Sequence, residues 1–121
     1  SIPNRFTLGG LFTSNQLSQP FRGEVDELRI WNGVALPITD IRNWMCQKIQ
    51  SSHPNFSYLA NLYAFNTISG LNILDSRTNL FNGSLVNYSD PSTAYFVSGA
   101  AIGDLSLNIY PGSWTNQGLS Y

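Results

Sequence analysis

The sequence is poor in charge and in long apolar runs, and both shortages narrow what the chain can do. Charged residues make up 11% of its 121 residues, against roughly 25% in soluble domains. The six basic residues are scattered and the net charge is −1. Since no basic stripe is available to neutralise phosphates, we expect no nucleic-acid partner. No apolar run approaches the roughly 20 residues of a membrane helix, so we also expect no membrane insertion.

Cysteine is nearly missing too, because Cys46 is the only one. An internal disulfide is therefore excluded, and the redox compartment cannot be read from the sequence. Trp44 and Met45 precede this residue, and such an apolar setting predicts a buried, inert thiol.

What is present is typical of β-proteins. Hydrophobic residues make up 42% and aromatic residues 13%, and Asn, Ser, Thr and Gly largely replace Lys and Glu. Period-two alternation between turn residues predicts short strands, at residues 5–8, 21–31, 58–65, 71–74, 85–86, 94–97 and 105–110, with a new element beginning near 114. Residues 13–20 read as a loop, residues 66–70 as a turn, and Asn82-Gly83 as a turn signal. Alternation fails at Asp26-Glu27, which predicts a bulge there or a strand buried on both faces.

One short α-helix is predicted near residues 38–50. Pro37 precedes it, and Thr39 or Asp40 can cap it. An apolar stripe at near-helical spacing follows, formed by Ile38, Ile41, Met45 and Ile49 and widened by Trp44 and Cys46. The helix should end before His53-Pro54, because a residue that precedes proline is disfavoured in the α region.

Residues 23–32 read Gly-Glu-Val-Asp-Glu-Leu-Arg-Ile-Trp-Asn. With residues 35–36 and the predicted helix, they resemble the last strand and closing helix of laminin-G-like, concanavalin-A-like jelly rolls. Leu8-Gly9-Gly10 is similar to the strand before. The resemblance implies a mostly β fold, a partial jelly-roll β-sandwich with one short helix, and marks Gly23, Asp26, Arg29 and Trp31 as its structural motif.

Three later segments, residues 62–76, 82–85 and 98–104, resemble the opening strands of the same modules. This order is similar to that in very large bacterial secreted surface proteins, including gliding-motility adhesins. It implies that residues 1–52 form the C-terminal half of one module and that residues 53–121 open the next. Together with an N-terminus that lacks signal-peptide features, it leads us to expect a fragment of a longer polypeptide. The sequence departs from the family where Asn66-Thr67 replaces an Asp-Glu pair, which weakens a metal or salt-bridge role at that turn, and where Ala101 replaces a proline.

The acidic trio Glu24, Asp26 and Glu27 invites comparison with jelly-roll glucanases. Those enzymes align three carboxylates on one strand face, two of them about 5 Å apart for retaining hydrolysis. Here Leu28 and Arg29 occupy the positions of the third carboxylate, so we expect no enzyme. Asp26 is instead expected to accept backbone hydrogen bonds or to pair with Arg29.

Two kinds of ligand stay open. Asp75, Asp90 and Asp104 lie in turn-rich stretches and are candidate calcium ligands, although capping of Asx turns is the commoner use of such residues. Tyr88, Tyr95 and Trp114 lie among polar loop residues and are candidates for stacking on sugar rings, with core packing as the alternative. The isolated His53 does not indicate a zinc site, and apart from calcium no cofactor is expected.

The resemblance predicts a non-catalytic extracellular module for adhesion or recognition, or a spacer, within a large multi-repeat cell-surface protein. Its expected partners are neighbouring modules of the same polypeptide or a larger surface or secretion assembly, with carbohydrate as a candidate ligand. The alternative is a carbohydrate-binding module appended to a secreted glycoside hydrolase.

Overall fold

A computed structural model describes residues 6–13, 16–66, 68–69, 71–88, 96–98, 105–109 and 113–116. The helical elements are the α-helix α1 (Ile38–Trp44) and the 3-10 helix η1 (Phe56–Tyr58). The strands are β1 (Phe6–Leu8), β2 (Leu11–Thr13), β3 (Gln16–Ser18), β4 (Gly23–Val25), β5 (Leu28–Trp31), β6 (Leu59–Tyr63), β7 (Ile68–Ser69), β8 (Asn72–Ile73), β9 (Gly83–Val86), β10 (Phe96–Ser98), β11 (Leu105–Ile109) and β12 (Ser113–Asn116). The predicted mostly β fold with one short α-helix is therefore confirmed, while its assignment to the jelly rolls stays a prediction.

Among the described residues, the strands form two larger sheets and two separate pairs of strands. One sheet has the order β1-β12-β9-β8-β7 and the other the order β10-β11-β4. The β2–β3 and β5–β6 pairs are separate two-stranded sheets, and every pairing is antiparallel. Strands before residue 52 pair directly with strands after it: β1 with β12, β4 with β11, and β5 with β6.

The hydrophobic core lies in the part of the molecule that contains the two larger sheets. Its buried side chains are Tyr63, Phe65, Ile73, Leu85, Tyr88, Phe96, Leu107 and Ile109. Period-two patterning explains the contribution of β6, where Leu59, Asn61 and Tyr63 are buried and the residues between them are half-buried. The same alternation buries Gly83 and Leu85 in β9.

The single strand predicted over residues 21–31, with a bulge at Asp26-Glu27 or burial on both faces, is instead two strands that belong to different sheets. β4 ends at Val25 and β5 begins at Leu28, and Glu27 has a positive φ of 50° that no regular strand allows. β4 pairs with β11, whereas β5 pairs with β6. The chain therefore changes sheets at this point, and the helix that follows β5 lies outside the two larger sheets.

Helix α1 differs from the prediction in length and cap. It ends at Trp44, its N-cap is Pro37, and no side chain caps it. The predicted Thr39 or Asp40 cap is wrong, because the Asp40 carboxylate accepts a hydrogen bond from the Asn55 side chain. None of its residues is buried.

The predicted burial of Cys46 is also wrong, because its side chain is exposed. Cys46 follows the end of α1, and its neighbour Met45 is itself 61% exposed. An apolar sequence setting therefore does not produce an apolar environment at this position, where the apolar side chains lie on the surface.

Two short elements occur where the sequence predicts irregular structure. In the β2–β3 hairpin, β2 ends at the first residue of the loop predicted over residues 13–20, and β3 lies inside that loop. Strand β7 lies inside the turn predicted over residues 66–70. Gly83, read as part of a turn signal, is instead the first residue of β9. These elements are short, and their pairing partners rather than their own sequences define them.

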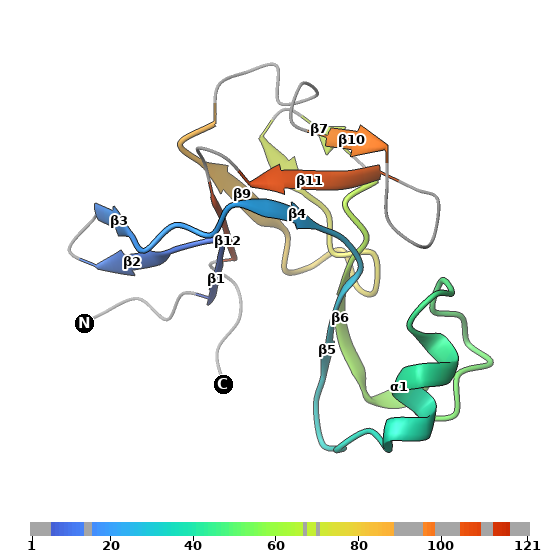
Figure 1. Cartoon of the computed structure of the whole chain (residues 1–121). Coiled ribbons are helices and arrows are strands. Elements are labelled where there is room, and N and C mark those ends of the chain that lie inside the picture. The colour runs from blue at the N-terminus through green and yellow to red at the C-terminus, as the bar shows by residue number, and fades with distance from the viewer. Residues whose placement is uncertain are drawn as a thin grey trace.

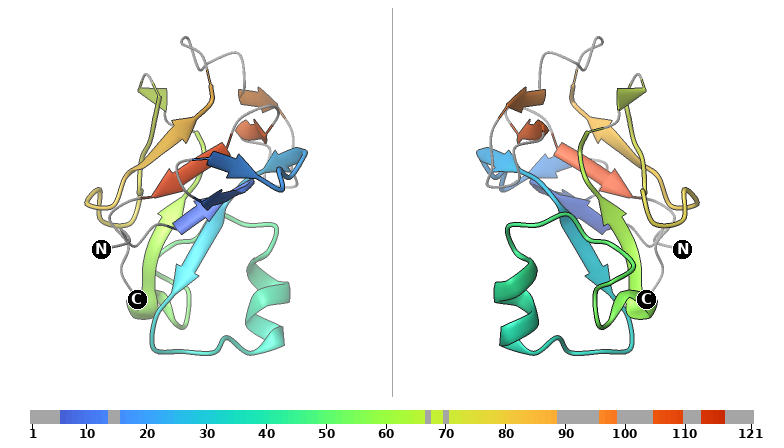
Figure 2. Two further views of the ribbon diagram at one scale, coloured as in Figure 1. Left: turned by 90° about the vertical axis from the view of Figure 1, so that its left-hand side faces the viewer. Right: turned by 90° about the vertical axis from the view of Figure 1, so that its right-hand side faces the viewer.

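The arrangement of the elements places α1 at one end of the molecule. β5 and β6 run away from the two larger sheets, and α1 lies beside the far end of this pair (Figure 1). Side views show the same arrangement, with α1 next to β5 and away from the larger sheets (Figure 2).

Candidate functional site

Of the three aromatic residues predicted to stack on sugars, the structure describes the side chain of Tyr88 alone, and that side chain is buried. Tyr88 is 8% exposed, and its hydroxyl donates a hydrogen bond to the Asn108 carbonyl at 3.1 Å. It fills the core, which was the alternative interpretation. Tyr95 lies outside the described residues. Trp114 belongs to β12, opposite Leu85 in the neighbouring strand, but its side chain also lies outside them.

Asp75, the first candidate calcium ligand, is the centre of a buried hydrogen-bond network. Its side chain is fully buried. Oδ1 accepts from the backbone N–H groups of Leu62 at 3.1 Å and Arg77 at 3.0 Å. Oδ2 accepts from the Asn61 amide at 3.1 Å and the Thr78 hydroxyl at 2.5 Å. The carboxylate therefore fixes the segment after β8 against β6.

Burial by itself raises the pKa of Asp75, but the hydrogen bonds from Thr78, Leu62, Asn61 and Arg77 outweigh it and hold the pKa below its ordinary value of 3.8. A carboxylate offers about four lone-pair sites, and four donors occupy them here. A metal ion would have to displace one or more of these donors to reach the oxygens. Asp75 has the structural, turn-stabilising role that was the alternative to calcium binding.

Asp90 and Asp104, the other two candidate calcium ligands, lie outside the described residues. Within the described ranges, no three His, Cys, Asp or Glu side chains gather in a way that could hold a metal ion.

The acidic trio does not form a pair of carboxylates on one strand face. Glu24 is exposed on β4, whereas Asp26 lies beyond the end of that strand. The Asp26 Oδ1 accepts the Glu27 N–H at 2.9 Å, which confirms the predicted backbone hydrogen bond. The ion pair of Arg29 is with Glu27, at 3.4 Å.

Arg29, one of the motif residues, joins α1 to β5. Its Nη1 donates to the Trp44 carbonyl at 2.8 Å, and its Nη2 donates to the Gln47 carbonyl. The first of these is at the C-terminus of the helix, where carbonyls lack intrahelical donors and a cation is favourable. A seven-residue helix is too short to be stable alone, so Arg29 positions it through these bonds.

A cavity of about 110 Å³ lies between α1, β5 and the segment that follows the helix. Its lining comprises Arg29, Trp31, Leu36, Asp40, Ile41, Trp44, Met45, Ile49 and His53. Most of these side chains are apolar, so the cavity suits an apolar group.

Three rings form one wall of this cavity. His53 is 3% exposed, and its ring centre lies 4.7 Å from that of Trp31 and 4.9 Å from that of Trp44. Its Nδ1 accepts the Asn55 N–H at 3.0 Å, so this nitrogen carries no proton. Because His53 lies against both indoles, one face of each is occupied within the protein, and the isolated His53 is a packing residue.

The rim of the cavity carries an exposed apolar surface, which we call the helix face: Ile38, Ile41 and Met45. These side chains are 57%, 45% and 61% exposed. Their spacing of three and four residues puts them on one side of the helix, and two of them, Ile41 and Met45, also line the cavity. The sequence predicted this apolar stripe but contained no signal for the cavity beside it.

The size of the cavity limits its ligand. An apolar cavity of about 150 Å³ holds benzene, and sites for drug-sized ligands are about 300–1,000 Å³. A volume of about 110 Å³ therefore suits one branched aliphatic side chain.

No family model, curated protein or solved structure matches the chain. Among the described residues, no helix is both long and apolar enough to span a membrane.

Proposed function

We propose that this chain is a non-catalytic adhesion or recognition module of an extracellular cell-surface protein. It makes its contact through the helix face and the adjoining cavity, and its partner is a protein segment that inserts an aliphatic side chain. The observation that carries this proposal is the exposed stripe of Ile38, Ile41 and Met45 beside an apolar cavity.

The exposed side chains of the helix face are costly to leave in water. Large exposed aliphatic side chains that lie together, rather than singly, mark interaction sites on soluble proteins. Insertion of apolar side chains into a hydrophobic groove is also a common form of protein recognition. Arg29 supports the site because it fixes the helix through the Trp44 carbonyl.

The acidic residues favour a non-catalytic role. Glu24 and Asp26 do not share a strand face, and neither lines the cavity. Retaining hydrolysis needs two carboxyl groups about 5 Å apart on one cleft wall. We include an extracellular location in the proposal because residues 23–32 resemble segments of secreted surface modules.

The test is selection of a phage-displayed peptide library on the immobilised chain, followed by titration of selected peptides against tryptophan fluorescence. We expect peptides with a Leu, Ile or Val anchor, and loss of their binding in Ile41→Glu, which puts a charge at the cavity rim. Leu11→Ser, a change at a 48% exposed position on β2, is the matched control and should bind normally. Peptides that bind Ile41→Glu as well as the wild type would refute the helix face as the site.

The carbohydrate-binding alternative has its own test. The chain, Ile41→Glu and Leu11→Ser are mixed with insoluble cellulose, chitin and xylan, and the bound fraction is measured. Our proposal predicts that none is retained. Retention of all three proteins would support the alternative, since a sugar surface would then lie elsewhere on the chain.

A further inference from the structure

The chain also carries an exposed aliphatic side chain on a well-fixed loop. Leu80 is 76% exposed, and its neighbour Phe81 is 36% exposed. They lie in the segment that joins β8 to β9. This segment begins at the buried Asp75, whose carbonyl accepts the Asn79 N–H at 2.7 Å and whose N–H donates to the Asn82 side chain at 2.8 Å.

Further hydrogen bonds hold the same loop near its tip. The Leu80 N–H donates to the Thr78 hydroxyl at 3.3 Å, and the Tyr63 hydroxyl donates to the Phe81 carbonyl at 2.7 Å. The loop therefore presents Leu80 to solvent in a defined position. Such pre-organisation lowers the entropic cost of inserting a side chain into a partner.

We propose that Leu80 of one copy of this chain inserts into the cavity beside the helix face of a second copy. This inference rests on the proposed function, because it names the protein segment that the cavity receives. The match is one of size and chemistry: the cavity measures about 110 Å³ and is lined mainly by apolar side chains, and Leu80 is a branched aliphatic residue.

The charge of the chain favours contact between copies. The net charge is −1, from seven acidic and six basic residues. Repulsion between two copies is therefore small, whereas a strong net charge keeps proteins apart.

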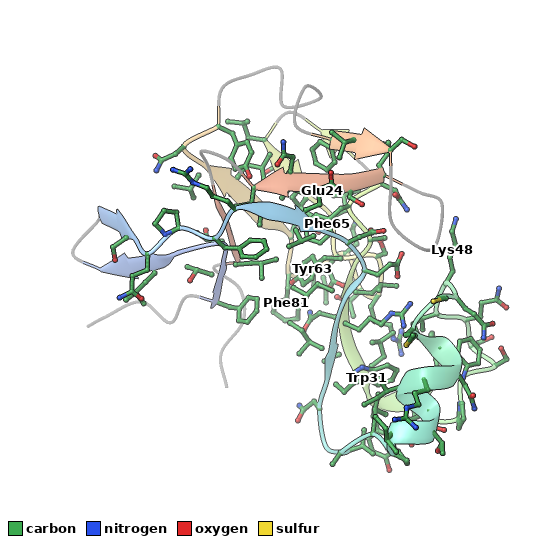
Figure 3. The ribbon with its side chains drawn as sticks, viewed as in Figure 1. Glu24, Trp31, Lys48, Tyr63, Phe65 and Phe81 are labelled. Atoms are coloured by element: carbon green, nitrogen blue, oxygen red, sulfur yellow. The ribbon has the colours of Figure 1, made fainter. Side chains whose placement is uncertain are left out.

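The two surfaces lie apart on the molecule, so one copy cannot fill its own cavity. The segment joining β8 to β9 and helix α1 lie on opposite sides of the β5–β6 pair (Figure 2). The side-chain view separates Phe81, next to Leu80, from Trp31 in the cavity wall (Figure 3). Contacts between two different surfaces add copies head to tail, as open chains or as closed rings.

The first measurement is sedimentation velocity of the wild type from micromolar to millimolar concentration. We expect the average mass to rise steadily, without a plateau at the dimer. Leu80→Ser removes the inserted side chain and should weaken association about tenfold to a hundredfold, which matches the loss of one buried leucine. Leu11→Ser should associate like the wild type, and circular dichroism confirms that each variant is folded.

A mixing experiment tests the pairing itself. Leu80→Ser retains the cavity, Ile41→Glu retains Leu80, and each variant alone should stay monomeric at the lowest concentrations where the wild type associates. Mixed in equal amounts, they should form dimers and nothing larger, because only one productive contact is available between them.

A wild type that stays monomeric at millimolar concentration would overturn the inference. So would association that Leu80→Ser leaves unchanged, or a mixture that stays monomeric while the wild type associates. If the selected peptides still bind the wild type at Ile41, the proposed function stands and its partner is another protein. If the wild type neither binds peptides at Ile41 nor self-associates, the proposed function is refuted as well.

Discussion

Replacement of Asp75 by alanine should be the most damaging single polar change among the described residues. Its buried carboxylate accepts four hydrogen bonds. Each bond to a charged group contributes about 1.5–3 kcal/mol, so a simple sum is about 6–12 kcal/mol. Such contributions are not additive, and water entering the space left by the carboxylate will satisfy part of the network. We therefore expect a loss of about 4 kcal/mol, a large share of the roughly 5–15 kcal/mol that stabilises a domain.

Asp75→Asn should cost much less, about 1–2 kcal/mol. The two backbone donors, Leu62 and Arg77, both bind Oδ1, which asparagine retains. The donors to Oδ2 are the Asn61 amide and the Thr78 hydroxyl. Both can reverse their roles, Asn61 by turning its amide and Thr78 by rotating its hydroxyl, and so accept from the new NH₂ group.

The assay is urea unfolding followed by tryptophan fluorescence at neutral pH and in acid. The pKa of Asp75 is lowered in the folded protein, so its contribution is fully present above the unfolded value of about 3.9. That contribution is lost as the pH falls through the lower folded pKa. The stability difference between the wild type and Asp75→Asn should therefore shrink in acid.

Asp40→Asn is the matched control for Asp75→Asn. Its partly buried carboxylate accepts a side-chain bond from Asn55, so we expect a loss below about 1 kcal/mol. If Asp75→Ala unfolds within about 1 kcal/mol of the wild type, the network does not stabilise the fold and the reasoning is wrong.

Three further changes test other contacts. Arg29→Met removes the hydrogen bonds to the Trp44 and Gln47 carbonyls. The rate of hydrogen exchange across residues 38–47 should then rise about 30-fold, which corresponds to a loss of about 2 kcal/mol in local stability. An unchanged exchange rate would contradict the role of Arg29 in fixing the helix. Tyr63→Phe loses the bond to the Phe81 carbonyl and should lower stability to urea by about 1 kcal/mol. Iodoacetamide should label the exposed Cys46 equally fast with and without denaturant; protection in the native protein would show that the thiol is covered.

The Asp75 network illustrates what sequence reasoning could not supply. An Asp before Ser76 in a turn-rich stretch predicts capping, and that interpretation is correct. The pattern does not reveal that Asn61 and Leu62 of β6 will also reach this carboxylate, because more than ten residues separate them in the chain. Full burial of the group, and the use of its lone pairs by protein donors, follow only from that tertiary contact.

The helix face shows the same limit. The spacing of Ile38, Ile41 and Met45 predicts a helix with an apolar side, because periodicity is a local property. Whether that side packs inward depends on what the rest of the chain places against it. Here the chain leaves the larger sheets at Asp26-Glu27, so α1 lies at the end of the β5–β6 pair and its apolar side is exposed.

The sequence alone determined the mostly β class, the place of the short α-helix after Pro37 and the scarcity of charge, and at Asp26-Glu27 it indicated only that the alternation fails. Each of these depends on neighbouring residues or on composition. Only the tertiary structure decided that β1 pairs with β12, that Asp75 is saturated with donors, and that the apolar stripe lies beside a cavity. Those features depend on contacts between distant segments, whose free energies are set by which surfaces meet rather than by any local pattern.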